Sequence, residues 1–82
     1  MEVSETIRKI ISAQTGVPVH DLAADQHFRM LPAMDSMRVL QIILETENAL
    51  GIEVPDDATF RVQTVGEFEE LVAELCQERS RT

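Results

Sequence analysis

The chain is short of the residues on which several classes of protein depend. Its single cysteine, Cys76, can form no internal disulfide and supplies no set of metal ligands. Only seven lysines and arginines stand against fifteen aspartates and glutamates, so the counterion release that drives nucleic-acid binding is not available. No apolar run approaches the length of a membrane span, and the first five residues lack the basic start of a signal peptide. We therefore expect a cytoplasmic location and no nucleic-acid partner.

What the chain does contain indicates one small folded unit. Its 82 residues leave room for a single domain over residues 1–82, expected as a monomer, and the 44% hydrophobic content favours a folded state despite a net charge of −8. The acidity is uneven. Residues 1–44 hold five acids and four bases, whereas residues 45–78 hold ten acids and one base. This second half either steers a basic partner towards the protein or simply keeps the domain soluble.

The spacing of apolar residues predicts an all-α fold. Helical periodicity appears over residues 2–14, 36–50 and 64–78, and a brief helical turn fits residues 56–62. The prediction is a small four-helix bundle of three longer helices and one short one, with a long loop over residues 16–34 between the first two helices. Loops of that length in small domains are often functional.

Local signals define the ends of these helices and the anchors between them. Gly16 and Gly51 are placed to close the first two helices, and Thr64 to Glu67 match a capping box. Cys76 falls on the apolar stripe of the last helix and is expected to be buried. The expected apolar anchors of the loop and of the short turn are Val17, Val19, Leu22, Phe28, Leu31, Phe60 and Val62.

A helical wheel divides residues 36–50 into three faces. The predicted core face holds Val39, Ile42, Ile43 and Leu50. A flanking apolar strip holds Met37, Leu40 and Leu44. The polar face holds Arg38, Gln41, Glu45 and Asn48. The strip makes the apolar surface wider than one core contact requires.

The tripeptide Asp35-Ser36-Met37 stands at the front of this helix, and its surroundings resemble an acyl carrier protein. The resemblance continues through residues 47–56 and residues 64–67 in the order and spacing of that family, so it spans most of the chain. It implies that Ser36 carries a 4′-phosphopantetheine arm ending in a thiol. Coenzyme A would be the donor, and a separate phosphopantetheinyl transferase would attach the arm. On this interpretation the protein is a carrier and not an enzyme.

The resemblance also suggests how partners would contact the chain. Asp35 is a plausible N-cap, and an esterified Ser36 would lie beside the free N–H groups and the positive end of the helix dipole. The expected partners are enzymes that load acyl or aminoacyl groups, together with acyltransferases and synthases. The predicted partner-binding residues are Met37, Leu40, Gln41, Leu44, Glu47 and Glu53.

The chain departs from the usual family pattern at several positions. Arg38 and Gln41 stand where fatty-acid-synthase carriers often have acidic residues, which indicates a less anionic surface near Ser36. Thr46 and Phe68 could narrow or polarise an internal acyl cavity, which favours short, polar or aminoacyl cargo. Ordinary repacking of the core is the alternative explanation.

Other interpretations remain alongside the acyl carrier. An aminoacyl or D-alanyl carrier has a similar helix and serine, and an unmodified interaction domain could keep the same fold. Peptidyl carriers usually have Gly-Gly before the modified region, whereas this chain has Pro32-Ala33-Met34. His20 and His27 accompany no nucleophile-elbow signature, so a catalytic Ser36 is not favoured. The aspartates form no calcium-loop pattern.

Overall fold

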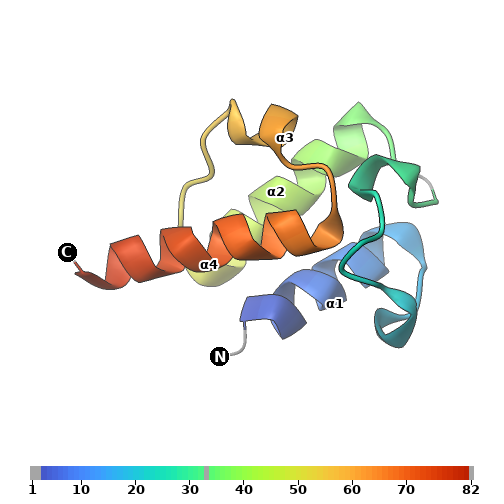
Figure 1. The fold of residues 1–82 in the computed structure, drawn as a ribbon, viewed down its shortest axis with the longest axis horizontal. Coiled ribbons are helices and arrows are strands. Elements are labelled where there is room, and N and C mark those ends of the chain that lie inside the picture. Colours follow the sequence, from blue (N-terminus) through green and yellow to red (C-terminus); the bar gives the residue numbers. More distant parts are fainter. Residues whose placement is uncertain (1–2, 33, 82) are drawn as a thin grey trace.

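The computed structural model describes residues 3–32 and 34–81, and the regular elements of this part of the chain are helices joined by turns and loops. The long helices are α1 (Val3–Thr15), α2 (Ser36–Leu50) and α4 (Val65–Arg81). The single turn α3 (Ala58–Arg61) precedes α4, and the 3₁₀ turns η1 (Val19–Asp21) and η2 (Phe28–Met30) lie between α1 and α2. Helix α1 packs against both α2 and α4 (Figure 1). The described residues contain no strand, so the all-α prediction is confirmed.

The ends of α1 and α2 follow the glycine signals in the sequence. Gly16 has a φ of 80°, and its N–H donates to the Ser12 carbonyl at 2.8 Å. Gly51 has a φ of 65°, and its N–H donates to the Glu47 carbonyl at 2.8 Å. Side chains with a Cβ rarely adopt this left-handed conformation, which is why glycine closes both helices. Helix α2 has the predicted bounds, and α1 extends to Thr15.

The capping box at the start of α4 is also present. The Glu67 N–H donates to the Thr64 hydroxyl at 3.1 Å, and the Thr64 N–H donates to the Glu67 carboxylate at 3.0 Å. Helix α4 continues to Arg81, beyond the predicted end near Glu78. Cys76 is half-buried and packs against the core, rather than being fully buried. The side chain of Phe60, a predicted anchor of the short turn, lies outside the part that the structure describes.

The long loop is held to α4 by backbone hydrogen bonds. The Phe28 N–H donates to the Gln63 carbonyl at 2.8 Å, and the Val65 N–H donates to the Gln26 carbonyl at 3.0 Å. The Gly66 N–H donates to the Ala24 carbonyl at 2.8 Å. A Cβ on Gly66 would lie 3.0 Å from that carbonyl oxygen, so a larger residue here would fit only if the loop backbone shifted. We call this set of contacts the loop clamp.

Apolar anchors complete the attachment of the loop. Leu22, Phe28 and Leu31 are buried and Val17 is half-buried, as predicted. Val19 is 36% exposed, so its prediction as an anchor was wrong. It lies in η1, where the 3₁₀ turn directs its side chain away from the core while Leu22 takes the buried position.

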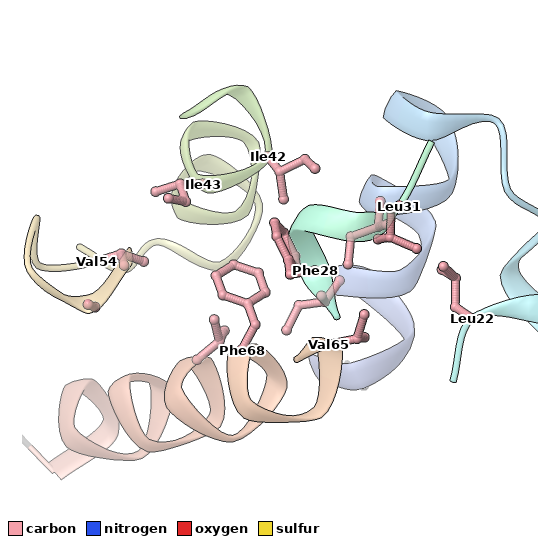
Figure 2. Close-up of a cluster of buried hydrophobic side chains, with 12 residues drawn as sticks. Leu22, Phe28, Leu31, Ile42, Ile43, Val54, Val65 and Phe68 are labelled. Carbon is pink, nitrogen blue, oxygen red and sulfur yellow. The ribbon is translucent and has the colours of Figure 1, made fainter. Parts of the chain in front are cut away.

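The core lies between α1, α2, α4 and the loop. Figure 2 shows the rings of Phe28 and Phe68 side by side, with Ile42 and Ile43 of α2 on one side and Val65 on the other. The two ring centroids are 5.4 Å apart and the planes meet at 53°, a tilted arrangement favoured by aromatic quadrupoles. The loop therefore supplies a central part of the core, and its position follows from that packing.

A partly buried ion pair joins α1 to α4. Arg8 Nε donates to a Glu69 carboxylate oxygen at 3.0 Å, Arg8 also donates to the Leu22 carbonyl at 2.7 Å, and the Ser4 hydroxyl donates to Glu69. Burial alone would raise the pKa of the Glu69 carboxyl. The hydrogen bonds from Arg8 and Ser4, with the Arg8 charge, outweigh that effect and hold this pKa below its usual value.

Candidate functional site

Ser36 is the first residue of α2, and its side chain is exposed. Asp35 precedes it as the N-cap, and its Oδ1 accepts a hydrogen bond from the Arg38 N–H at 2.8 Å. The Asp35 carbonyl accepts the first intrahelical bond, from the Val39 N–H at 2.9 Å. A fixed helix end thus presents the Ser36 hydroxyl to solvent, as predicted for its position. The capping of the helix by Asp35 is confirmed.

This helix end suits a phosphodiester on Ser36. The first-turn N–H groups of Ser36 and Met37 have no carbonyl four residues earlier within α2, so they are available to phosphate oxygens. The positive end of the helix dipole favours the same negative charge. The Asp35 carboxylate accepts the Arg38 N–H through one of its oxygens. This bond leaves the N–H groups nearest the serine available to a phosphate. When bound, phosphopantetheine would supply a thiol that forms thioesters.

The apolar strip of α2 is exposed to solvent. Met37 is 68% exposed, Leu40 50% and Leu44 48%, whereas Ile42 and Ile43 next to them are buried. The three strip residues repeat at the spacing of one helix face, and they begin immediately after Ser36. The strip is exposed as predicted, and of the predicted core face Ile42 and Ile43 are buried while Val39 and Leu50 are half-buried against the core. Gln41, also predicted to bind partners, is exposed on the same helix.

Arg38 makes a contact that sequence reasoning missed. Its guanidinium donates to the Gln14 side-chain oxygen at 3.0 Å, and the Gln14 amide donates to the Glu45 carboxylate. Gln14 on α1 thus joins two residues that lie two turns apart on α2. The positive charge of Arg38, in the first turn after Ser36, is directed towards α1. No pattern in the sequence announces this bond, because it depends on how α1 packs against α2.

The two predicted acidic contacts differ in their surroundings. Glu53 is exposed. Glu47 is half-buried, and its carboxylate accepts a hydrogen bond from the Val54 N–H at 2.7 Å. Glu47 therefore stabilises the turn after α2 in two ways. Its carboxylate accepts the Val54 N–H, and its backbone carbonyl accepts the Gly51 N–H. A role in partner binding stays a prediction for both residues.

Met30, which precedes Ser36 in the chain, is a further exposed apolar side chain that sequence reasoning missed. It is 82% exposed, more than any strip residue, and it belongs to η2. Apolar periodicity could not identify it because η2 is too short to have a period. A compositional signal was present: three of the four methionines of the chain lie at positions 30, 34 and 37.

The remaining candidates do not gather at Ser36. His20 lies beside Asp21 in η1 at 3.6 Å, and His27 pairs its backbone with Thr64. Within residues 3–32 and 34–81, no group of three or more histidine, cysteine or acidic side chains is placed to hold a metal ion. Over the same residues, no helix is both long enough and apolar enough to cross a membrane.

Comparisons with known proteins agree with this geometry. A family model described as a phosphopantetheine attachment site matches residues 5–72. The chain is 30% identical over 64 residues to acyl carrier protein 2 of Pseudomonas aeruginosa, a match that covers 78% of this chain and 81% of that protein. It is also 30% identical over 73 residues to the acyl carrier protein of Rubrobacter xylanophilus, covering 89% of this chain and 90% of that one.

The chain belongs to the acyl carrier protein family, whose members bear a phosphopantetheine attachment site. Its role is that of a carrier, and its cofactor is covalently bound 4′-phosphopantetheine. Such carriers interact with synthase and transferase enzymes, and the catalysis belongs to those enzymes.

Proposed function

We propose that this chain carries acyl intermediates as thioesters on a phosphopantetheine arm attached to Ser36. The observation that supports this assignment is the exposed Ser36 hydroxyl at the start of a capped helix of 15 residues. The helix end holds the serine in place, and no core contact is broken when the serine is esterified.

The attachment reaction requires a separate transferase and coenzyme A. The Ser36 Oγ forms a new bond to the phosphorus next to pantetheine, and the bond from that phosphorus to the bridging oxygen of the pyrophosphate breaks. The adenosine bisphosphate part of coenzyme A leaves, and a base on the transferase takes the hydroxyl proton. This chain contributes the nucleophilic oxygen and the first-turn N–H groups that receive the phosphodiester charge.

The docking of partner enzymes is a further part of the proposal. Met37, Leu40 and Leu44 would supply apolar contact, with Gln41 beside them, while Glu47 and Glu53 lie in the acidic half that steers the approach. The flexible side chain of Met37 suits a surface that meets several enzymes in turn. In this proposal the chain acts as one domain over residues 1–82, α3 serves as the short fourth helix, and the cytoplasmic location stays a prediction.

Intact mass tests the assignment of Ser36. Incubation with coenzyme A and a phosphopantetheinyl transferase should add one phosphopantetheine to the wild-type chain and none to Ser36→Ala. The Ala variant should keep its stability within about 0.5 kcal/mol, because an exposed hydroxyl contributes little packing. Ser12→Ala in α1 is the matched control and should be modified normally. Modification of Ser36→Ala, or its unfolding, would contradict the proposal.

The dimensions of the core favour a short cargo. An apolar space lined in part by Phe28, Val39, Ile43 and Phe68 has a volume of about 20 Å³, little more than one water-sized group requires. The Phe28 and Phe68 rings fill the region between α2 and α4, and the Thr46 hydroxyl donates to the Ile42 carbonyl at 2.7 Å. A long acyl chain would have to open this packing. Short acyl, polar or aminoacyl cargo can remain outside the core and leave this packing unchanged.

Thermal unfolding of a series of loaded carriers tests the cargo. If the cargo remains outside the core, acyl groups of two and twelve carbons should give the same melting temperature. If a chain enters the core, each buried methylene adds about 0.8 kcal/mol, and stability should increase with chain length. Such an increase would exclude the short-cargo proposal while leaving the attachment at Ser36 unaffected.

A further inference from the structure

The exposed apolar side chains of the molecule are concentrated around Ser36. The described residues leave five large apolar side chains exposed, and four of these belong to the interval from residue 30 to residue 44. Single exposed apolar residues are normal on a protein surface, but a group of them marks an interaction site. Three of the four form the strip on α2 that follows Ser36. The fourth, Met30, comes from the loop that precedes it.

Met30 is held in a fixed position. Phe28, in the same turn η2, and Leu31, which follows the turn, are 5% and 4% exposed and are part of the core. The Met30 N–H donates to the His27 carbonyl at 3.1 Å, and the Leu31 N–H donates to the Phe28 carbonyl at 3.4 Å. The loop clamp also ties Phe28 to Gln63, just before α4. The exposure of Met30 is therefore imposed by a structured turn.

The turn also keeps Met30 close to the attachment point. The Met34 N–H donates to the Leu31 carbonyl at 3.2 Å, which folds the chain back one residue before the N-cap Asp35. Figure 1 shows the loop segment that contains η2 next to the start of α2. Met30 and Met37 thus flank Ser36 in the chain, one on the loop before it and the other on α2 after it.

Two charged residues beside Ser36 in the chain, Asp35 and Arg38, are engaged by contacts within the protein. Asp35 accepts the Arg38 N–H, and the Arg38 guanidinium is bound to Gln14. The exposed large apolar side chains before and after the serine are Met30 on the loop and Met37 and Leu40 on α2, and the exposed charge beside them on η2 is Arg29. A complementary partner would present an apolar, weakly charged patch there.

We propose that Met30 is a docking residue for the transferase that loads Ser36, and that this enzyme contacts apolar side chains on both sides of the serine. The inference rests on the proposed attachment at Ser36. The loading enzyme is the occupant that the geometry favours, because its reaction takes place at the Ser36 oxygen itself. Enzymes that act later react at the far end of the arm and need not cover the surface on both sides of the serine.

Loading kinetics with coenzyme A and a phosphopantetheinyl transferase provide the test. Met30→Glu in the apo-carrier should raise the KM for the carrier about fivefold, the effect of losing one interface residue of ordinary strength, with kcat little changed. Met30→Leu keeps the apolar contact and should load like the wild type. Met30→Ala removes the contact without adding charge and should raise the KM in the same direction. All three should keep the wild-type melting temperature.

Val19→Glu is the matched control, since Val19 is the exposed apolar residue of the other 3₁₀ turn, η1. It adds the same charge away from the proposed surface and should load normally. An unchanged KM for Met30→Glu, an equal rise for Val19→Glu, or a clear loss of stability in the Met30 variants would overturn the inference. If the wild type takes up no phosphopantetheine, or Ser36→Ala does, the proposed attachment fails instead.

Discussion

The surface of α2 near Ser36 and the contact between α1, the loop and α4 differ in what their residues contact. At α2, Met37 and Leu44 stay in solvent and the Ser36 hydroxyl is exposed. On the other side, Arg8 and Glu69 form a partly buried pair and Gly66 lies against the loop backbone. One region offers contacts to another molecule, and the other has already made its contacts internally. Substitutions in the first should alter function, and substitutions in the second should alter stability.

The largest separation should appear between two adjacent residues of α2. Ile43 is 8% exposed and Leu44 is 48% exposed. Ile43→Ala should lower the free energy of unfolding by about 2–5 kcal/mol because it leaves a cavity in the core. Leu44→Ala should cost about 0.5 kcal/mol yet weaken binding to a partner enzyme. Urea unfolding and a binding assay of both variants measure the two effects. Equal destabilisation would show that the strip is part of the core.

The pair on α1 and α4 should show the next largest effect. Glu69→Gln should cost about 1.5–3 kcal/mol at neutral pH, since a hydrogen bond between charged groups is lost. The pKa of Glu69 lies below its usual value of 4.5, so the stabilisation is complete above that value and is lost as the pH falls through the lower, folded-state pKa.

The difference in unfolding free energy between the wild type and Glu69→Gln should therefore be constant above about pH 5 and shrink in acid. Glu70→Gln is the matched control, because Glu70 is an exposed neighbour on the same helix. A difference that grows as the pH falls would contradict the assigned direction of the pKa shift.

Sequence reasoning succeeded where the relevant signal is local. Helix α2 was predicted residue by residue because Asp35 caps its start, Gly51 closes it, and no glycine or proline interrupts it. Its apolar residues divide between core and strip because the helical period assigns each side chain a direction. The exposed position of Ser36 follows from the same geometry.

Sequence reasoning failed where a position depends on packing between distant segments. Val19 and Leu22 are both apolar residues of one aperiodic loop, and only the fold decides which of them is buried. The bond from Arg38 to Gln14 requires the packing of α1 on α2. The exposure of Met30 arises because Phe28 and Leu31 are buried on either side of it.

The loop clamp should respond to a single added methyl group. The Cβ of Gly66→Ala would lie 3.0 Å from the Ala24 carbonyl oxygen, so the loop must move. The expected net loss is about 1 kcal/mol, because overpacking costs about 1–3 kcal/mol and Ala in place of Gly recovers up to about 1 kcal/mol of helix propensity.

Hydrogen exchange separates this clash from other effects of a glycine substitution. In Gly66→Ala, the amides of Phe28 and Val65, which donate across the clamp, should exchange faster. Gly16→Ala is the control. No atom lies near an added Cβ at Gly16, so the destabilisation by Gly16→Ala comes from the φ of 80° alone. This variant should leave the amides of Phe28 and Val65 protected. Unchanged exchange in Gly66→Ala would show that the loop position does not depend on the close approach.

The smallest expected effect concerns the charge of the α2 region, and the structure determines which residue can test it. Reversing Glu47 would also remove the bond to the Val54 N–H, so a slower association could reflect a disturbed turn. Glu53 is exposed and offers a cleaner test. Glu53→Lys should lower the association rate with a partner enzyme about twofold or more, with little change in stability, if the acidic half steers the encounter.

Raising the ionic strength to 1 M shortens the Debye length to about 3 Å and should remove the difference between wild type and variant. Glu5→Lys on α1 changes the net charge equally and should have the smaller effect. If Glu5→Lys slows association as much as Glu53→Lys, the response follows net charge, and the acidic half has no directional role.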